Sequence, residues 1–471
     1  MNILRELRTD YIKIISLYII SFIVAYRLPR IYSYIFFSFL LVVFYLAKKD
    51  YFWLALIILL VSNTGSLFVV DNKLFTKGLP LYSFAGISLQ YIDVFSMVAF
   101  IKAMQHSIRH TIFLKKELIL LAGYFAFMIM YSFGLGMDKS GLITVAQVLV
   151  GFTFFYSFPK LINKASDFNK FIALIIPFVV IEFANVLFQF YYQQTFAGLL
   201  NNISILPSSE ESFRPDIFSL ADYFGICFAM YFLSRSDKNN GFFYLIILLS
   251  FVTMFLTATR SRIVVYIIML ILYFVVLQKF NIQKIFSFAL LFLVLFFISN
   301  RIINFHQWID NSLKRISTLE LLVKGDVTAG GTLQRIDVRL PRVLKGIKAN
   351  PVFGWGFSSA GSKYIDHHVG NFSLIAQVGI VGFILFMNFV INFFKKIHSW
   401  HKYFSRRNPF RKVLEVFMLL FISSLILQFS SYCFYDYLLS GVTLYWVIFI
   451  LKGIELNIIE GADYQKKLLT D

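Results

Sequence analysis

The chain has 471 residues, of which 59% are hydrophobic and only 15% carry a charge, whereas about a quarter of the residues of a soluble domain are charged. Together with a mean hydropathy of +0.74, this composition excludes a string of water-soluble domains and indicates side chains that mostly face lipid. Lys and Arg outnumber Asp and Glu by 44 to 25, which gives a net charge of +19. Cytoplasmic loops of membrane proteins collect basic residues, so this charge does not indicate nucleic-acid binding.

Long apolar segments recur along the chain, and a helix needs about 20 apolar residues to cross the hydrocarbon core of a bilayer. Helices are expected because they satisfy their own backbone hydrogen bonds within lipid. The expected spans are residues 11–27, 31–47, 51–70, 91–105, 117–134, 141–158, 168–191, 214–234, 241–257, 263–278, 283–299, 372–394, 413–433 and 441–456. The sequence therefore predicts an all-α, polytopic membrane helical bundle of about 12–14 transmembrane helices with one large extracytoplasmic loop.

These spans divide the chain into three parts. Residues 1–299 hold the first eleven spans, 300–371 form the large loop, and 372–471 hold the last three spans and a cytoplasmic tail. With the N-terminus inside, every loop assigned to the cytoplasm contains Lys or Arg, in agreement with the positive-inside rule. We therefore expect a multi-pass protein of the cytoplasmic (inner) membrane, with its large loop and active site on the extracytoplasmic face.

The large loop is itself basic, with ten Lys and Arg against five Asp and Glu. Topology does not account for positive charge on this side of the membrane. Arg335, Arg339 and Arg342 follow the i, i+4, i+7 spacing that places side chains on one helical face. Guanidinium groups are well suited to bind phosphate oxygens. The alternative is a solvated helix whose arginines contact water and Asp337, and Pro341 would interrupt a single straight helix.

Three further arginines lie at predicted outer membrane boundaries. Arg260 and Arg262 stand at the outer end of the predicted span 241–257, and Arg214 begins the span 214–234. Each could face an anionic substrate. The alternative for all three is an interfacial anchor whose guanidinium reaches the lipid headgroups.

His367 and His368 lie beside Asp366, just before the span 372–394. Histidine is the side chain best suited to accept a proton near neutral pH. An acid–histidine pair could activate a hydroxyl nucleophile in the basic loop. The alternative is a pair of ordinary surface residues.

Three motifs together resemble the O-antigen ligase/polymerase membrane family. Thr259-Arg260-Ser261-Arg262 is similar to its T-x-S-R signature. Arg335 followed by the segment NPVFGWG at residues 350–356 is similar to its "R … N-P-hydrophobic-x-G-x-G" run. His368 followed by GIVG at residues 379–382 is similar to its "H-N-x-x-L … E-x-G-L-L-G" block. Order, spacing and placement agree over about residues 210–395, whereas the first two hundred residues resemble the family only in hydropathy.

The chain departs from the family pattern at three positions. Val369 stands where the family often has Asn, Gln377 replaces an acid, and Ile263 replaces a Gly. These departures put the details of the histidine neighbourhood in question, and they leave the family resemblance in place.

The resemblance implies a helical glycosyltransferase fold of the C type, acting on a glycan linked to a polyisoprenyl diphosphate in the lipid bilayer. It implies diphosphate contacts for Arg262 and Arg335, and an acceptor-activating or acceptor-positioning role for His368. Arg214, Arg260, Arg339, Arg342 and His367 are the additional candidates for substrate binding. No D-x-D motif occurs in the predicted outer loops, so we expect a metal-independent reaction without a cofactor.

The expected function is that of an O-antigen or capsular polysaccharide polymerase, with a chain-length regulator as a further candidate partner. A ligase of the same family is an alternative because the motifs scarcely separate the two. A lipid-linked oligosaccharide flippase or other transporter is an alternative of a different class. Transporters typically show two similar halves and a substrate site near mid-membrane, whereas this chain concentrates its charge in one loop.

Overall fold

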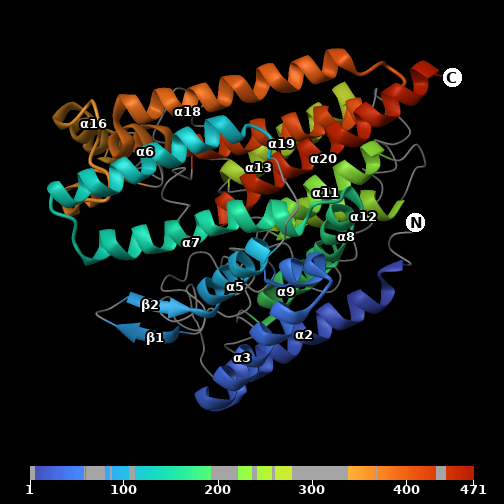
Figure 1. The fold of residues 1–471 in the computed structure, drawn as a ribbon, viewed down its shortest axis with the longest axis horizontal. Helices are drawn as coiled ribbons and strands as arrows, with labels where there is room; N and C mark the ends of the chain where they lie inside the picture. Colours follow the sequence, from blue (N-terminus) through green and yellow to red (C-terminus); the bar gives the residue numbers. More distant parts are fainter. Residues whose placement is uncertain are drawn as a thin grey trace. The chain divides into compact units, whose positions relative to one another are not determined.

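The computed structural model describes the chain as a helical protein that falls into two compact units. The described residues are 6–57, 59, 80–84, 87–105, 112–192, 221–235, 241–256, 260–277, 338–366, 369–430 and 442–470. Unit 1 comprises Met1–His106 and Leu161–Ile316, and unit 2 comprises Ser107–Lys160 and Ser317–Asp471. Each unit is described by itself below. The predicted all-α class is confirmed (Figure 1).

Unit 1 contains most of the helices of the N-terminal half. They are α2 (Arg8–Arg27), α3 (Arg30–Leu46), α5 (Tyr91–Gln105), α8 (Ala165–Ile175), α9 (Pro177–Tyr192), α11 (Ala221–Arg235), α12 (Gly241–Leu256) and α13 (Arg260–Ile271), which continues as the π-helix η1 (Leu272–Leu277). The predicted span 168–191 is interrupted between α8 and α9. The predicted span 283–299 lies outside the described residues, as does most of 51–70.

One element of unit 1 was not expected from the sequence. Strand β1 (Pro80–Phe84) pairs antiparallel with β2 (Ile87–Gln90), with Phe84 opposite Ile87 and a register shift between Pro80 and Tyr82. The hairpin lies between predicted spans, where the apolar-run criterion makes no assignment. It is an addition to the helical class within the described residues.

Close packing in unit 1 depends on a small residue between α9 and α11. A Cβ atom at Gly225 would lie 2.0 Å from Cγ2 of Val179. Nearby, Lys102 is buried in the last turn of α5 and its Nζ donates to the carbonyls of Phe44 and Ala47 at the end of α3. The Lys102 ammonium thus supplements the hydrogen bonds at the C-terminal end of α3, where carbonyls lack full intrahelical partners.

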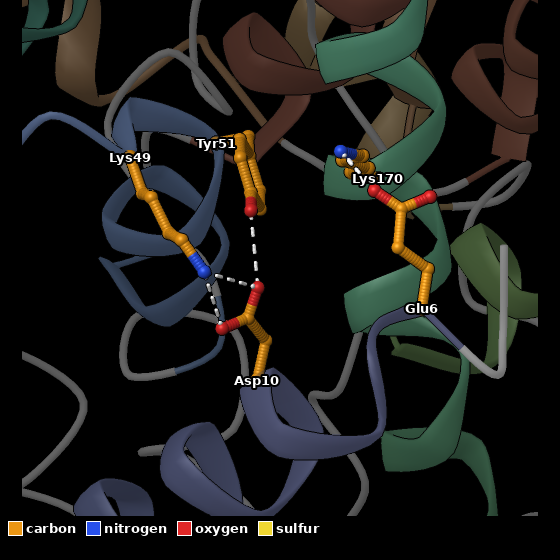
Figure 2. A network of polar contacts seen from close by, with 5 residues as sticks. All are labelled: Glu6, Asp10, Lys49, Tyr51 and Lys170. Atoms are coloured by element: carbon orange, nitrogen blue, oxygen red, sulfur yellow. Dashed lines mark hydrogen bonds and ion pairs between the residues drawn. The ribbon is translucent and has the colours of Figure 1, made fainter.

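A polar network holds the start of α2 to two other parts of unit 1 (Figure 2). The Asp10 carboxylate is buried, and it accepts from Lys49 Nζ at 2.9 Å and from the Tyr51 hydroxyl at 3.0 Å. Glu6 pairs with Lys170 of α8 at 2.5 Å. Lys49 and Lys170 are thus both bound to acidic residues at or just before the start of α2.

Unit 2 contains the described part of the large loop and the helices that hold it. Its helices are α6 (Lys115–Gly134), α7 (Lys139–Leu161, whose last residue is assigned to unit 1), α16 (Leu340–Ala349), α17 (Ser359–Ser362), α18 (Gly370–Tyr403), α19 (Phe410–Ser430) and α20 (Val442–Thr470). Helix α18 continues to Tyr403, past the predicted end at residue 394. Helix α16 begins at Leu340 with Pro341 in its first turn, where a missing N–H costs nothing.

Three helical segments among the described residues have the length and composition to cross a membrane. They are Lys115–Gly134, Ala165–Phe188 and Gly370–Tyr403. Four shorter apolar helices accompany them, at Ile31–Leu46, Val94–Gln105, Gly241–Met254 and Ile263–Phe274. These segments support a membrane-embedded, multi-pass protein.

Helix α18 is interrupted at Gly379, which adopts φ 67° and ψ −177°. In an unbroken helix the N–H groups of residues 380 and 381 would donate to the carbonyls of residues 376 and 377. The segment 351–356 supplies partners to all four groups instead. The hydrogen bonds are Trp355 N–H to Ala376 O (2.9 Å), Gly356 N–H to Gln377 O (2.8 Å), Ile380 N–H to Pro351 O (2.9 Å) and Val381 N–H to Val352 O (3.2 Å). We call residues 351–356 the inserted segment.

Helix α6 supports the inserted segment from another side. The Ser132 hydroxyl accepts from the backbone N–H of Phe357 at 2.8 Å, and the Tyr131 hydroxyl accepts from the Asn350 amide at 3.0 Å. The Tyr124 hydroxyl donates to the carbonyl of Val378, next to the interruption in α18. The family-like motifs at 350–356 and 379–382 therefore bind each other and α6.

Replacing Gly379 by Ala should destabilise unit 2, because this backbone conformation is almost restricted to glycine. A Cβ atom there would also lie 2.1 Å from the Val352 carbonyl oxygen. We expect a loss of about 2–4 kcal/mol from strain and steric overlap together, measured by thermal unfolding of the purified protein in detergent. The control is Gly136→Ala, since Gly136 also has positive φ but nothing lies within 4 Å of its Cβ position. Equal losses for the two variants would contradict the role assigned to the inserted segment.

Candidate functional site

The described part of the large loop presents a basic helix face. Helix α16 buries Val343 against Val369 and Ala376 of the chain around the start of α18, and Figure 1 shows the two helices together. The helix also exposes Arg342, and further along Lys345 and Lys348. The apolar side thus fixes α16 on α18, and the basic side is left accessible.

Arg339 and Arg342 converge on one carboxylate. Nη2 of Arg342 lies 2.5 Å from Oδ2 of Asp366, and Nη1 of Arg339 lies 3.5 Å from Oδ1. The Asp366 side chain is 9% exposed, whereas those of Arg339 and Arg342 are 31% and 48% exposed. The three groups carry a net charge of +1. Because a guanidinium has five N–H donors, each ion pair leaves donors on the exposed edge of the arginine.

The backbone of Asp366 is fixed to the first turn of α18. Its N–H donates to the Ser373 hydroxyl at 2.9 Å, and the same hydroxyl donates to the Asp366 carbonyl at 2.6 Å. That carbonyl also accepts from the N–H of Val369 at 3.0 Å. The residues on both sides of His367 and His368 are therefore joined to each other and to α18.

The structure brings together two of the arginines singled out in the sequence, Arg339 and Arg342. It places Arg260 and Arg262 in the first turn of α13, in unit 1. The remaining site candidates lie outside the described residues: Arg214, Arg335, His367 and His368. Their roles, and the expected diphosphate contact of Arg262, stay predictions.

Arg335 lies outside the described residues, so the three-arginine helical face stays a prediction. Helix α16 begins at Leu340, with Arg339 at its N-cap and Arg342 in its first turn. The counter-ion of Arg342 is Asp366, 24 residues further along the chain, whereas the sequence suggests Asp337 for this role and Asp366 as a partner of histidine. Pro341 lies in the first turn, where its ring is tolerated.

Sequence reasoning also missed the support from α6. Tyr131 and Ser132 end an apolar segment in which the sequence shows only a membrane span. Their hydroxyls lie more than two hundred residues from the groups they bind. The one available signal was the pair of polar side chains at the end of a predicted span.

Among the described residues, no group of three or more His, Cys, Asp or Glu side chains could hold a metal ion. The charged groups that the described loop offers to a ligand are guanidinium and ammonium groups, which favour an anion.

Part of the chain matches a family of known proteins. Residues 245–387 match the family model described as O-antigen ligase, over less than a third of the chain. The match contains α13, α16, the inserted segment and the start of α18, and it excludes Arg214. The curated proteins gave no match to the chain. The family match confirms the resemblance carried by the three motifs and supports an O-antigen ligase/polymerase-like family for this protein.

Proposed function

We propose that this protein is a polysaccharide polymerase of the O-antigen or capsule type, with its active site on the extracytoplasmic face of the cytoplasmic membrane. It transfers glycan from a polyisoprenyl-diphosphate carrier to a sugar hydroxyl of another lipid-linked repeat unit. The observation that carries the proposal is the O-antigen ligase match over the large loop. In that loop Arg339 and Arg342 converge on Asp366, which directly precedes His367 and His368 in the sequence.

The proposed reaction is a displacement at the anomeric carbon of the donor glycan. The acceptor oxygen forms a bond to this carbon, and the bond between the carbon and the diphosphate oxygen breaks. The electron pair leaves with the carrier diphosphate, and the hydroxyl proton passes to His368. Arg262 and Arg335 stabilise the charge that develops on the leaving diphosphate. The reaction is metal-independent in this proposal because guanidinium groups supply the positive charge.

A ligase uses the same donor chemistry with a different acceptor, so it is the second candidate. The family model is described by ligase activity, which favours this candidate as much as the motifs do. A transporter is less well supported, because the basic residues gather in one loop next to a histidine pair. A chain-length regulator would be an additional partner of a polymerase.

Alanine substitutions at Arg262, Arg335 or His368 should leave the protein in the membrane and remove most of its activity. Removing one donor to a developing oxyanion costs about 100-fold to 1,000-fold in rate, and a similar range applies to loss of a proton acceptor. Polymer formation by the purified variants measures the effect. Lys348→Ala is the control, since this lysine of α16 is exposed and is not one of the candidate site residues. Wild-type polymer formation by Arg335→Ala would show that the diphosphate assignment is wrong.

Glycan electrophoresis of a deletion strain separates the two candidate functions. Loss of a polymerase should leave acceptors that carry a single repeat unit. Loss of a ligase should leave acceptors without glycan, while carrier-linked polymer accumulates. The second pattern would contradict the polymerase proposal and establish the ligase.

A further inference from the structure

We propose that Asp366 is a positioning residue, which holds Arg339 and Arg342 in place for an anionic substrate group. This inference rests on the proposed function and deepens it, because neither the motifs nor the family match assigns a role to Asp366. The class of ligand is a phosphate-bearing group such as the carrier diphosphate. Three sets of contacts support the proposal.

The side chain of Asp366 is a fixed point for both arginines. It is 9% exposed and contacts Arg342 at 2.5 Å and Arg339 at 3.5 Å, while both arginines keep accessible surface. Long arginine side chains lose rotational entropy when they bind an anion, and a carboxylate that already holds them reduces this cost. The charge left over, +1, is of the sign that an anion requires.

The backbone of Asp366 is also constrained. Its N–H and carbonyl bind the Ser373 hydroxyl, and its carbonyl also accepts from the N–H of Val369. These contacts hold the Cα of Asp366 at the start of α18, and its side chain reaches Arg339 and Arg342 from there. Asp366 thus links α16 to α18.

The part of α18 that holds Asp366 is itself fixed. Ser373 binds the backbone of Asp366, and the inserted segment binds α18 a few residues later, where Trp355 and Gly356 donate to Ala376 and Gln377. These contacts hold the pair of arginines in one position relative to α18.

The test sets positioning against simple electrostatics. Asp366→Asn removes a negative charge, so electrostatics alone predicts tighter anion binding. Positioning predicts the opposite, a loss of about tenfold, comparable with one charge-assisted hydrogen bond. The measurement is calorimetric titration of the purified full-length protein in detergent with inorganic pyrophosphate. Asp138→Asn is the charge-matched control, since Asp138 is exposed in unit 2 and an asparagine there keeps the hydrogen bond to Gly141.

Further variants separate positioning from a loss of folding. Arg342→Gln should weaken binding about tenfold, whereas Lys363→Gln, an equal change of charge at an exposed lysine of the same loop, should not. The losses in the double variant Asp366→Asn/Arg342→Gln should be less than additive, because part of the effect of Asp366 acts through Arg342. Ser373→Ala keeps every charge and should still weaken binding several-fold. Asp366→Glu should restore part of the binding lost in Asp366→Asn.

Unchanged or tighter pyrophosphate binding by Asp366→Asn would overturn the positioning role. Additive losses in the double variant would overturn it as well. The same holds if the wild-type protein does not bind pyrophosphate. If Asp366→Asn fails to fold, wild-type binding by Ser373→Ala overturns it instead. The proposed function is tested by the glycans of the deletion strain, and that test does not depend on this titration. Failure of one proposal can therefore be told from failure of the other.

Discussion

The hydrogen bonds between residues 351–356 and the interruption of α18 at Gly379 fix the geometry of everything near the candidate site. A break in a membrane helix leaves buried backbone groups that need partners, since an unpaired group is costly in lipid. The inserted segment supplies those partners with its own backbone. It thereby holds the end of α16, the beginning of α18 and the Asp366 region in one arrangement. Backbone hydrogen bonds of the inserted segment attach the large loop to α18, and the contacts of Asp366 and Ser373 add to this attachment.

Hydropathy predicted where helices lie better than where they end. Helix α5 spans the predicted residues 91–105, because an apolar segment bounded by polar residues marks both of its limits. Helix α18 passes its predicted end because a cluster including Lys395 and Lys396 stops the hydropathy signal and leaves the helical backbone unaffected. The interruption at Gly379 lies inside an apolar segment, and hydropathy carries no information on φ. The β-hairpin was missed because its strands are too short for a periodicity signal.

The sequence predicted the residue types of the candidate site more fully than it predicted the contacts between those residues. The sequence identified Arg339, Arg342 and Asp366 as charged groups of one basic loop, and spacing alone related only the two arginines. Their convergence on Asp366 depends on how α16 packs against α18, through Val343, Val369 and Ala376. Local spacing cannot give a contact between residues 24 positions apart, and the Tyr131 and Ser132 contacts of α6 are further still from local patterns. Family resemblance identified the motifs, and tertiary packing decided which of them bind each other.

The account depends on the large loop lying outside the cytoplasm, and labelling of intact cells tests this most directly. Lys363→Cys places a thiol at an exposed position of the loop, and Lys402→Cys places one near the predicted cytoplasmic end of α18. The account predicts that a membrane-impermeant thiol reagent labels residue 363 in intact cells and labels residue 402 only after the cells are opened. The reverse pattern would place Asp366 and its arginines in the cytoplasm and contradict the account.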